Sequence, residues 1–126
     1  IHDYVFSRSK VGADAVSPSH AASLPPVRQR LVRANPRTGA KNFYAGSHAR
    51  EIEGWEYDVS RELLEGLVTK ATKPEYVYAH SWQPGDLVVW DNRCTMHTRS
   101  KVDHTQPREM HRSLIKGEPV IPATEI

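Results

Sequence analysis

The segment Pro84-Gly85-Asp86-Leu87-Val88-Val89-Trp90 is the strongest clue to the architecture of this chain. Pro-Gly-Asp is typical of a turn, and the apolar residues that follow it favour a short β-strand. Before the turn, residues 75–82 alternate between the two faces of an extended chain, with Tyr76 and Tyr78 on one face and Val77 on the other. The pattern therefore predicts an antiparallel pair, 75–82 with 87–90, joined at this turn.

Working outward, the sequence predicts a second hairpin and a final strand. Residues 27–33 favour a strand, Asn35-Pro36-Arg37-Thr38-Gly39 is a turn signature, and residues 41–45 can return as the partner strand. Near the other end of the chain, residues 108–115 also favour a strand, which begins just after Pro107.

One helix is predicted between the two hairpins. Asp58 is a good N-cap residue for a helix over 59–70, and Pro74 stops it. Its apolar residues fall on one helical face: Leu63, Leu64, Leu67 and Val68. Residues 1–26 are poorly patterned and are expected to form a helix end or a strand followed by a loop. Together the elements predict a mainly β chain with one or two helices, part of a double-stranded β-helix or jelly roll.

The composition limits the classes of protein. A length of 126 residues fits one domain, and 38% hydrophobic with 25% charged residues is a globular balance. The net charge of +2 gives no nucleic-acid footprint, and no apolar run is long enough for a membrane helix. The single cysteine, Cys94, excludes a disulfide scaffold and is expected to be a buried thiol. We therefore expect a cytoplasmic protein without nucleic-acid or membrane partners. Because Met96 and Met110 both lie deep in the chain, we also expect a fragment of a longer protein.

The residues that could carry chemistry follow the first hairpin described. His97 comes shortly after the strand 87–90, and Arg108 and Arg112 lie four residues apart on the final strand. On an extended strand two side chains at this spacing leave the same face, separated by about 13 Å, so one face could hold two anions. Most histidines bind no metal, however, and arginines on an edge strand are commonly solvated, so the spacing leaves both interpretations open.

These residues carry a resemblance to a known family. The segment 84–93 followed by Thr95-Met96-His97, with arginines eleven and fifteen residues after the histidine, resembles the taurine/2,4-dichlorophenoxyacetate dioxygenases, which use Fe(II) and 2-oxoglutarate. Further upstream, four segments resemble the phenoxyalkanoate-degrading branch, namely Ser7-Arg8-Ser9-Lys10, 26–33, 36–39 and Ser47-His48-Ala49. Residues 1–126 would then be the C-terminal portion of one dioxygenase domain.

The resemblance implies a role for each of four residues. His97 would be the second histidine ligand of Fe(II), and Arg108 would pair with the distal carboxylate of 2-oxoglutarate. Arg112 would hold the anionic group of the substrate, and His48 would lie near that group, although a solvated loop histidine is an equal alternative. A guanidinium fork suits a carboxylate, and a neutral imidazole suits Fe(II). No residue of this chain is expected to act as a catalytic acid or base.

The resemblance also implies a reaction that this chain cannot perform alone. The family's His-x-Asp/Glu pair is absent, because the residues two places after the histidines are Tyr4, Ala22, Arg50, Trp82, Arg99, Gln106 and Ser113. The full-length protein, a homo-oligomer, would consume molecular oxygen and 2-oxoglutarate, releasing succinate and CO₂, and would cleave a phenoxyacetate-type ether to a phenol and glyoxylate. The alternatives are a taurine or alkylsulfonate dioxygenase and a non-catalytic β-rich module that binds anions.

Overall fold

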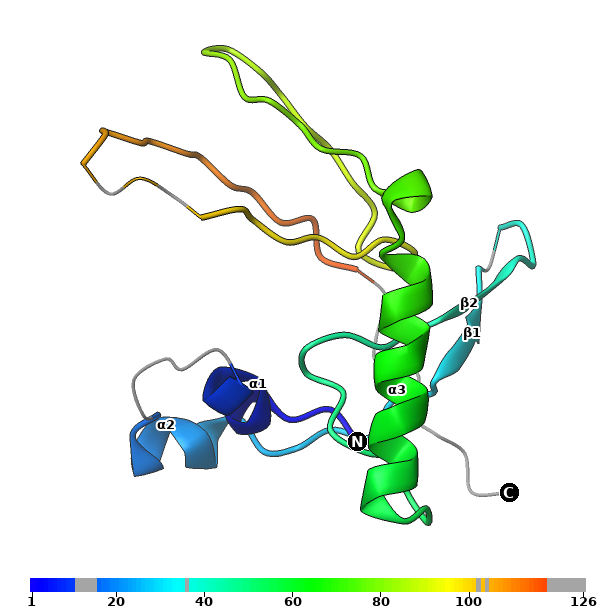
Figure 1. Cartoon of the computed structure of the whole chain (residues 1–126). Coiled ribbons are helices and arrows are strands. Elements are labelled where there is room, and N and C mark those ends of the chain that lie inside the picture. Colours follow the sequence, from blue (N-terminus) through cyan, green and yellow to red (C-terminus); the bar gives the residue numbers. More distant parts are fainter. Residues whose placement is uncertain (11–15, 36, 102, 104, 118–126) are drawn as a thin grey trace.

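The computed structural model describes residues 1–10, 16–35, 37–101, 103 and 105–117. Figure 1 shows a central long helix with shorter elements beside its lower part and extended segments that project from its upper end. In chain order the elements are α1 (Tyr4–Lys10), α2 (Pro18–Ser23), β1 (Val32–Ala34), β2 (Lys41–Phe43), α3 (Tyr57–Ala71) and the 3-10 helix η1 (Pro74–Tyr76). In the described part of the chain, no helix is long and apolar enough to cross a membrane.

The predicted helix is confirmed as α3, but its first residues differ from the expectation. The helix begins at Tyr57 with Glu56 at the N-cap position, and no side chain caps it. Asp58 was expected to be the N-cap and instead lies in the first turn, where its negative charge favours the positive end of the helix dipole. The helix ends at Ala71, just before η1 begins at Pro74.

The buried face of α3 is narrower than its apolar pattern predicts. Ser60 and Leu64 are buried, and Leu67 and Val68 are half-buried, whereas Leu63 is exposed. The buried hydroxyl of Ser60 has a partner, because its oxygen accepts a 3.1 Å hydrogen bond from the backbone N–H of Ile52. The loop after β2 therefore contacts α3 through a polar contact.

The N-terminal residues form two short helices that the sequence pattern does not reveal. Asp3 caps the start of α1, since its carboxylate accepts a 3.1 Å hydrogen bond from the N–H of Phe6. Ser17 caps α2 in the same way by accepting from the N–H of His20. His2 forms isolated antiparallel bridges with Val27 and Ala49, which tie the start of the chain to two later segments.

The upstream hairpin is confirmed as the antiparallel pair of β1 and β2, with Val32 opposite Phe43. Its turn is built as expected, because the Asn35 side chain accepts hydrogen bonds from the N–H groups of Arg37 and Thr38. Gly39 has a φ of +70°, which a side chain would oppose. Pro36 lies outside the described residues.

The other predicted strands are wrong for the structure described here. Residues 75 and 76 belong to η1, while 77–101 and 107–117 are extended or turn without strand assignment. In Figure 1 the chain doubles back at residues 83–86 and again before the segment 107–117. A strand needs a ladder of backbone hydrogen bonds and a buried face, and within the described residues these segments have no such ladder and are mostly exposed. Among the described residues the elements are three α-helices, one 3-10 helix and one two-stranded sheet, so the expected predominance of strands is not found there, and the jelly roll stays a prediction.

Candidate functional site

The segment before His97 is ordered by a compact turn at Asp91. Its carboxylate accepts from the backbone N–H of Arg93 at 2.8 Å and from the Arg93 guanidinium at 2.7 Å. The guanidinium lowers the pKa of Asp91 to about 2, so this carboxylate stays charged. The Asp91 carbonyl also accepts from the hydroxyl of Thr95 at 2.7 Å. Asp91 is therefore a turn residue.

His97 emerges from this turn and lies against Trp90. The two ring centroids are 5.1 Å apart, and the indole N–H of Trp90 donates to the side-chain oxygen of Asn92 at 2.8 Å. His97 is exposed, so its ring nitrogens are accessible. Cys94 is also exposed, which corrects the expectation of a buried thiol. The turn places the Cys94 sulfur at the surface, 3.8 Å from the carbonyl oxygen of Asp91.

Arg108 and Arg112 lie on the extended segment that returns after residues 103–106. Both are exposed, and within the described residues neither guanidinium has a hydrogen bond or an ion pair. Nearby, Glu109 pairs with His111 at 3.1 Å instead of with either arginine. The guanidinium groups of Arg108 and Arg112 are therefore available to anions from outside the chain.

His48 lies in the other half of the molecule, in the turn after β2. Its ring stacks on Tyr4 with centroids 6.0 Å apart, and its carbonyl oxygen accepts a 2.8 Å hydrogen bond from the N–H of Asp3. The ring is exposed, so a donor function toward an anion is compatible with its position. No contact within the described residues joins His48 to His97, Arg108 or Arg112, or joins these three to one another.

The residues that the structure does bring together were missed by sequence reasoning. Arg50 pairs with Asp3 at 2.7 Å and with Glu51 at 2.6 Å, and these carboxylates raise the pKa of Arg50. Arg61 of α3 donates to the carbonyl oxygens of Ala49 and Arg50 at 2.6 and 3.0 Å. Apart from the adjacent Glu51, the partners are 11 to 47 residues apart, so no sequence signal indicates these contacts.

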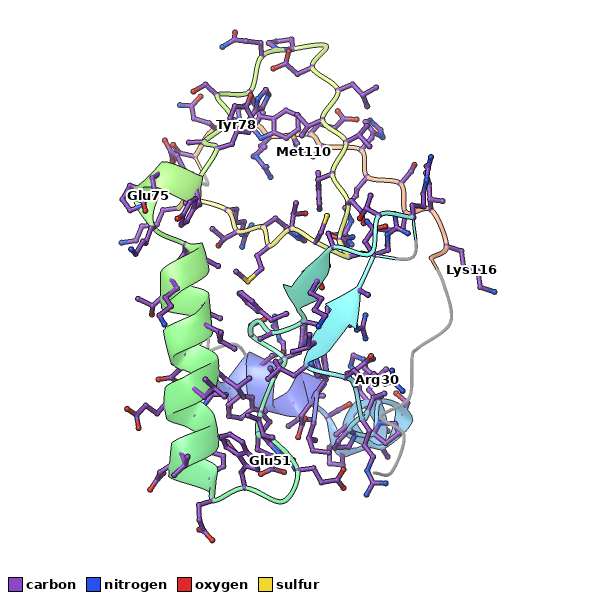
Figure 2. The ribbon with its side chains drawn as sticks, turned by 90° about the vertical axis from the view of Figure 1, so that its right-hand side faces the viewer. Arg30, Glu51, Glu75, Tyr78, Met110 and Lys116 are labelled. Atoms are coloured by element: carbon purple, nitrogen blue, oxygen red, sulfur yellow. The ribbon has the colours of Figure 1, made fainter. Side chains whose placement is uncertain are left out.

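A second missed cluster surrounds the ring of Tyr44. His2 stacks on it with centroids 5.0 Å apart, and the Arg33 guanidinium lies 3.7 Å from its centroid. Burial lowers the pKa of His2 to about 4, so its imidazole is neutral at pH 7. His2 and Tyr44 line a cavity of about 340 Å³ together with Glu51 and Ile52. Figure 2 labels Glu51 in this packed part, away from Tyr78 and Met110 on the extended segments.

Comparison with known proteins assigns the chain to a family. The family model described as "Taurine catabolism dioxygenase TauD, TfdA family" matches residues 1–114. The chain belongs to the TauD/TfdA dioxygenase family. Dioxygenases of this family use Fe(II) and 2-oxoglutarate. The match includes the turn at Asp91, His97 and both arginines of the returning segment.

The chain is similar to TauD/TfdA relatives that are named for phenoxy acids. It is 40% identical over 116 residues to the alpha-ketoglutarate-dependent 2,4-dichlorophenoxyacetate dioxygenase of Burkholderia sp. (strain RASC), covering 92% of this chain and 39% of the relative. It is also 40% identical over 124 residues to the (S)-phenoxypropionate/alpha-ketoglutarate-dioxygenase of Sphingobium herbicidovorans, covering 94% of this chain and 43% of the relative.

A solved structure supports the same placement within the TauD/TfdA family. The crystal structure of AAD-2 in complex with Mn(II) and N-oxalylglycine matches with a TM-score of 0.79 and 41% identity. The match covers 86% of this chain and 43% of AAD-2. The chain thus spans about two fifths of the length of these relatives.

The residues described here do not by themselves make the family's iron site. Within the described ranges, no three His, Cys, Asp or Glu side chains are grouped to hold a metal ion. The nearest carboxylate in sequence to His97 on its N-terminal side, Asp91, is occupied by Arg93. A non-haem Fe(II) site of the 2-His-1-carboxylate type needs two more ligands than His97 provides.

Proposed function

We propose that this chain is the anion-binding part of an Fe(II)/2-oxoglutarate-dependent dioxygenase that acts on a phenoxyacetate-type acid. The single observation that carries the proposal is the 40% identity to a 2,4-dichlorophenoxyacetate dioxygenase over 92% of the chain. The unpaired state of Arg108 and Arg112 supports it, because each guanidinium is free to take a carboxylate.

In this proposal each arginine holds a different acid. Arg108 binds the distal carboxylate of 2-oxoglutarate, and Arg112 binds the carboxylate of the phenoxy acid, with His48 donating to the same group. His97 supplies one imidazole ligand to Fe(II), and the other ligands come from outside the residues described. When bound, the iron supplies the oxidising chemistry, which needs oxygen and converts 2-oxoglutarate to succinate and CO₂.

The contribution of the protein is to position the substrate. Two fixed anion sites on one segment define where the phenoxy acid lies relative to the cosubstrate, so that the carbon beside the ether oxygen is the one that reacts. Hydroxylation at that carbon gives a hemiacetal, which collapses to a phenol and glyoxylate. The turn at Asp91 positions the His97 ring against Trp90, which limits its rotation.

The experiment uses the complete gene product that contains this chain. Aerobic incubation with Fe(II), 2-oxoglutarate and 2,4-dichlorophenoxyacetate is expected to release dichlorophenol and succinate in equal amounts. Sulfite release from taurine, without phenol release, would instead establish the sulfonate alternative. Binding of 2-oxoglutarate without any succinate formation would contradict the enzyme function and favour a non-catalytic anion module.

Three variants test the division of labour between the arginines. Arg108→Ala is expected to raise the KM for 2-oxoglutarate, and Arg112→Ala the KM for the phenoxy acid, each by about 30-fold or more if the lost contact is desolvated. Arg99→Ala changes another exposed arginine of the same region and serves as the control, with both KM values unchanged. Equal effects of Arg108→Ala and Arg112→Ala on both substrates would contradict the assignment.

A further inference from the structure

Three side chains near the turn at 83–86 form a hydrogen-bonded relay that the proposed function does not use. The Tyr78 hydroxyl lies 2.9 Å from Nδ1 of His80, and Nε2 of His80 lies 3.0 Å from Oδ2 of Asp86. The same Asp86 oxygen accepts a 2.8 Å hydrogen bond from the backbone N–H of Gln83. The edge of the His80 ring also meets Trp82, with centroids 4.7 Å apart.

The chemistry of the relay fixes which ring nitrogen carries the proton. An ionised carboxylate can only accept, so Nε2 of His80 must donate to Asp86. In the neutral imidazole Nδ1 is then the acceptor, and the hydroxyl of Tyr78 donates to it. The hydrogen bond from Gln83, followed by that from His80, lowers the pKa of Asp86, so its carboxylate is charged at neutral pH.

The relay lies where two paired β-strands would have a ladder of backbone hydrogen bonds. Residues 77–82 and 86–90 form no strand, and the turn has one backbone bond, from the N–H of Asp86 to the carbonyl of Gln83 at 3.1 Å. The side chains of His80 and Asp86 are partly shielded, with exposures of 24% and 32%. In contrast, the similar pair of His111 and Glu109 is 91% and 86% exposed and closes no turn. A shielded hydrogen bond is stronger than one in bulk water.

We propose that His80 is a positioning residue, held as the Nε2-protonated tautomer between Tyr78 and Asp86, and that it closes the hairpin formed by residues 77–90. Trp90 is the last residue of this hairpin, and the ring of His97 packs against it. The closed hairpin therefore sets the position of His97. The consequence for His97 rests on the function proposed above, whereas the tautomer and the closure of the hairpin do not.

The test is NMR spectroscopy of the complete gene product that contains this chain, at a pH where His80 is neutral. Nitrogen-15 shifts of the His80 ring are expected to show one tautomer, with the proton on Nε2, and NOEs are expected between residues 82 and 87. A mixture of the two tautomers of His80, or the absence of cross-turn NOEs in the unmodified chain, would overturn the proposal.

A matched pair of substitutions separates the two arms of the relay. His80→Gln places an amide near the position of Nε2 and retains the contact with Asp86, whereas His80→Asn imitates Nδ1 and retains only the contact with Tyr78. We expect the cross-turn NOEs to survive in His80→Gln and to be lost in His80→Asn, because only the Asp86 arm crosses the turn.

Two further variants test the relay without depending on whether the His80 variants fold. Tyr78→Phe removes a single hydroxyl and is expected to leave the proton on Nε2 of His80 and the hairpin closed, because the Asp86 carboxylate can only accept. His111→Gln is the control and should change neither observable. Unchanged NOEs in His80→Asn, or a proton that moves to Nδ1 of His80 in Tyr78→Phe, would show that the relay does not act as proposed.

Discussion

Residues 1–71 and residues 77–117 are held in different ways. In the first region the side chains join segments that are distant in sequence, as Arg50 joins Asp3 and Arg61 joins Ala49. In the second region, side-chain hydrogen bonds such as those at Asp91 and His80 join residues two to six positions apart. The contrast indicates that contacts between distant segments hold the first region together, whereas the second is held by local hydrogen bonds.

The division matches where the proposed chemistry lies. His97 and both candidate anion-binding arginines belong to the extended region, where exposed backbone and few buried contacts predict low local stability. Only His48 belongs to the packed region. Figure 1 shows the same separation, with the extended segments projecting from one end of α3 and the short helices lying beside its other end.

The most direct test of this contrast compares the substitution of a buried leucine with that of an exposed one. Leu64 of α3 is 4% exposed, whereas Leu87 of the extended region is 87% exposed. Leu64→Ala is expected to lower the free energy of unfolding by about 3 kcal/mol, through lost burial and a cavity, and Leu87→Ala by less than about 0.5 kcal/mol. Urea unfolding followed by circular dichroism measures both, and similar losses would mean that the two regions are equally packed.

A comparison of two arginines sharpens the same contrast. Arg61 donates to two backbone carbonyls and to Glu65, so Arg61→Ala should cost about 2 kcal/mol of unfolding free energy. Arg108 has no partner in the described chain, and Arg108→Ala should leave that free energy unchanged. Chemical denaturation of the two variants provides the measurement. A large loss in Arg108→Ala would show that its guanidinium has a structural partner.

The buried imidazole of the packed region predicts a pH dependence. Burial lowers the pKa of His2 to about 4 from its usual 6.5, so the unfolded chain binds more protons between these values. Stability from this group is therefore complete above pH 6.5 and is lost as the pH falls toward 4. The ring is only half-buried, and screening reduces the expected loss to about 1 kcal/mol. Unfolding free energies measured from pH 7 to 4 should flatten in His2→Gln but not in the His111→Gln control.

The smallest effect on stability is expected at the exposed apolar side chains. Ile115 is 95% exposed, so Ile115→Ser should change the free energy of unfolding by less than about 0.5 kcal/mol. The same substitution should reduce self-association and the binding of a hydrophobic dye, because it removes exposed apolar surface. Light scattering and dye fluorescence measure this. An unchanged signal would indicate that Ile115 is covered in solution.

Elements with local causes could be predicted from the sequence. The turn from Asn35 to Gly39 and the helix ending before Pro74 depend on residues within a few positions, and both were found. The short helix α1 was missed although its cap is local, since Asp3 accepts from the N–H of Phe6 three residues further on. The strands expected at 75–82, 87–90 and 108–115 failed for the opposite reason, since alternation shows only that a chain could pair if a neighbour were present.

The candidate site also has features that the sequence predicts and features that it does not. The order of His97, Arg108 and Arg112 along the chain was sufficient for the resemblance to the dioxygenases, and the family match confirmed it. The relay of Tyr78, His80 and Asp86 could have been sought from the sequence, because His80 and Asp86 flank a Pro-Gly turn. The exposure of Cys94 could not, because burial depends on neighbours that the local sequence does not specify.

The sequence alone determined the family, the long helix and the hairpin turns, because each follows from residue types at short, fixed spacings. Only the tertiary structure decided which cations are neutralised. Arg50 and Arg61 are bound by groups from distant parts of the chain, whereas Arg108 and Arg112 have no hydrogen bond or ion pair within the described residues. The physical reason is that an ion pair requires two groups to meet in space, and separation along the chain does not reveal which groups will meet.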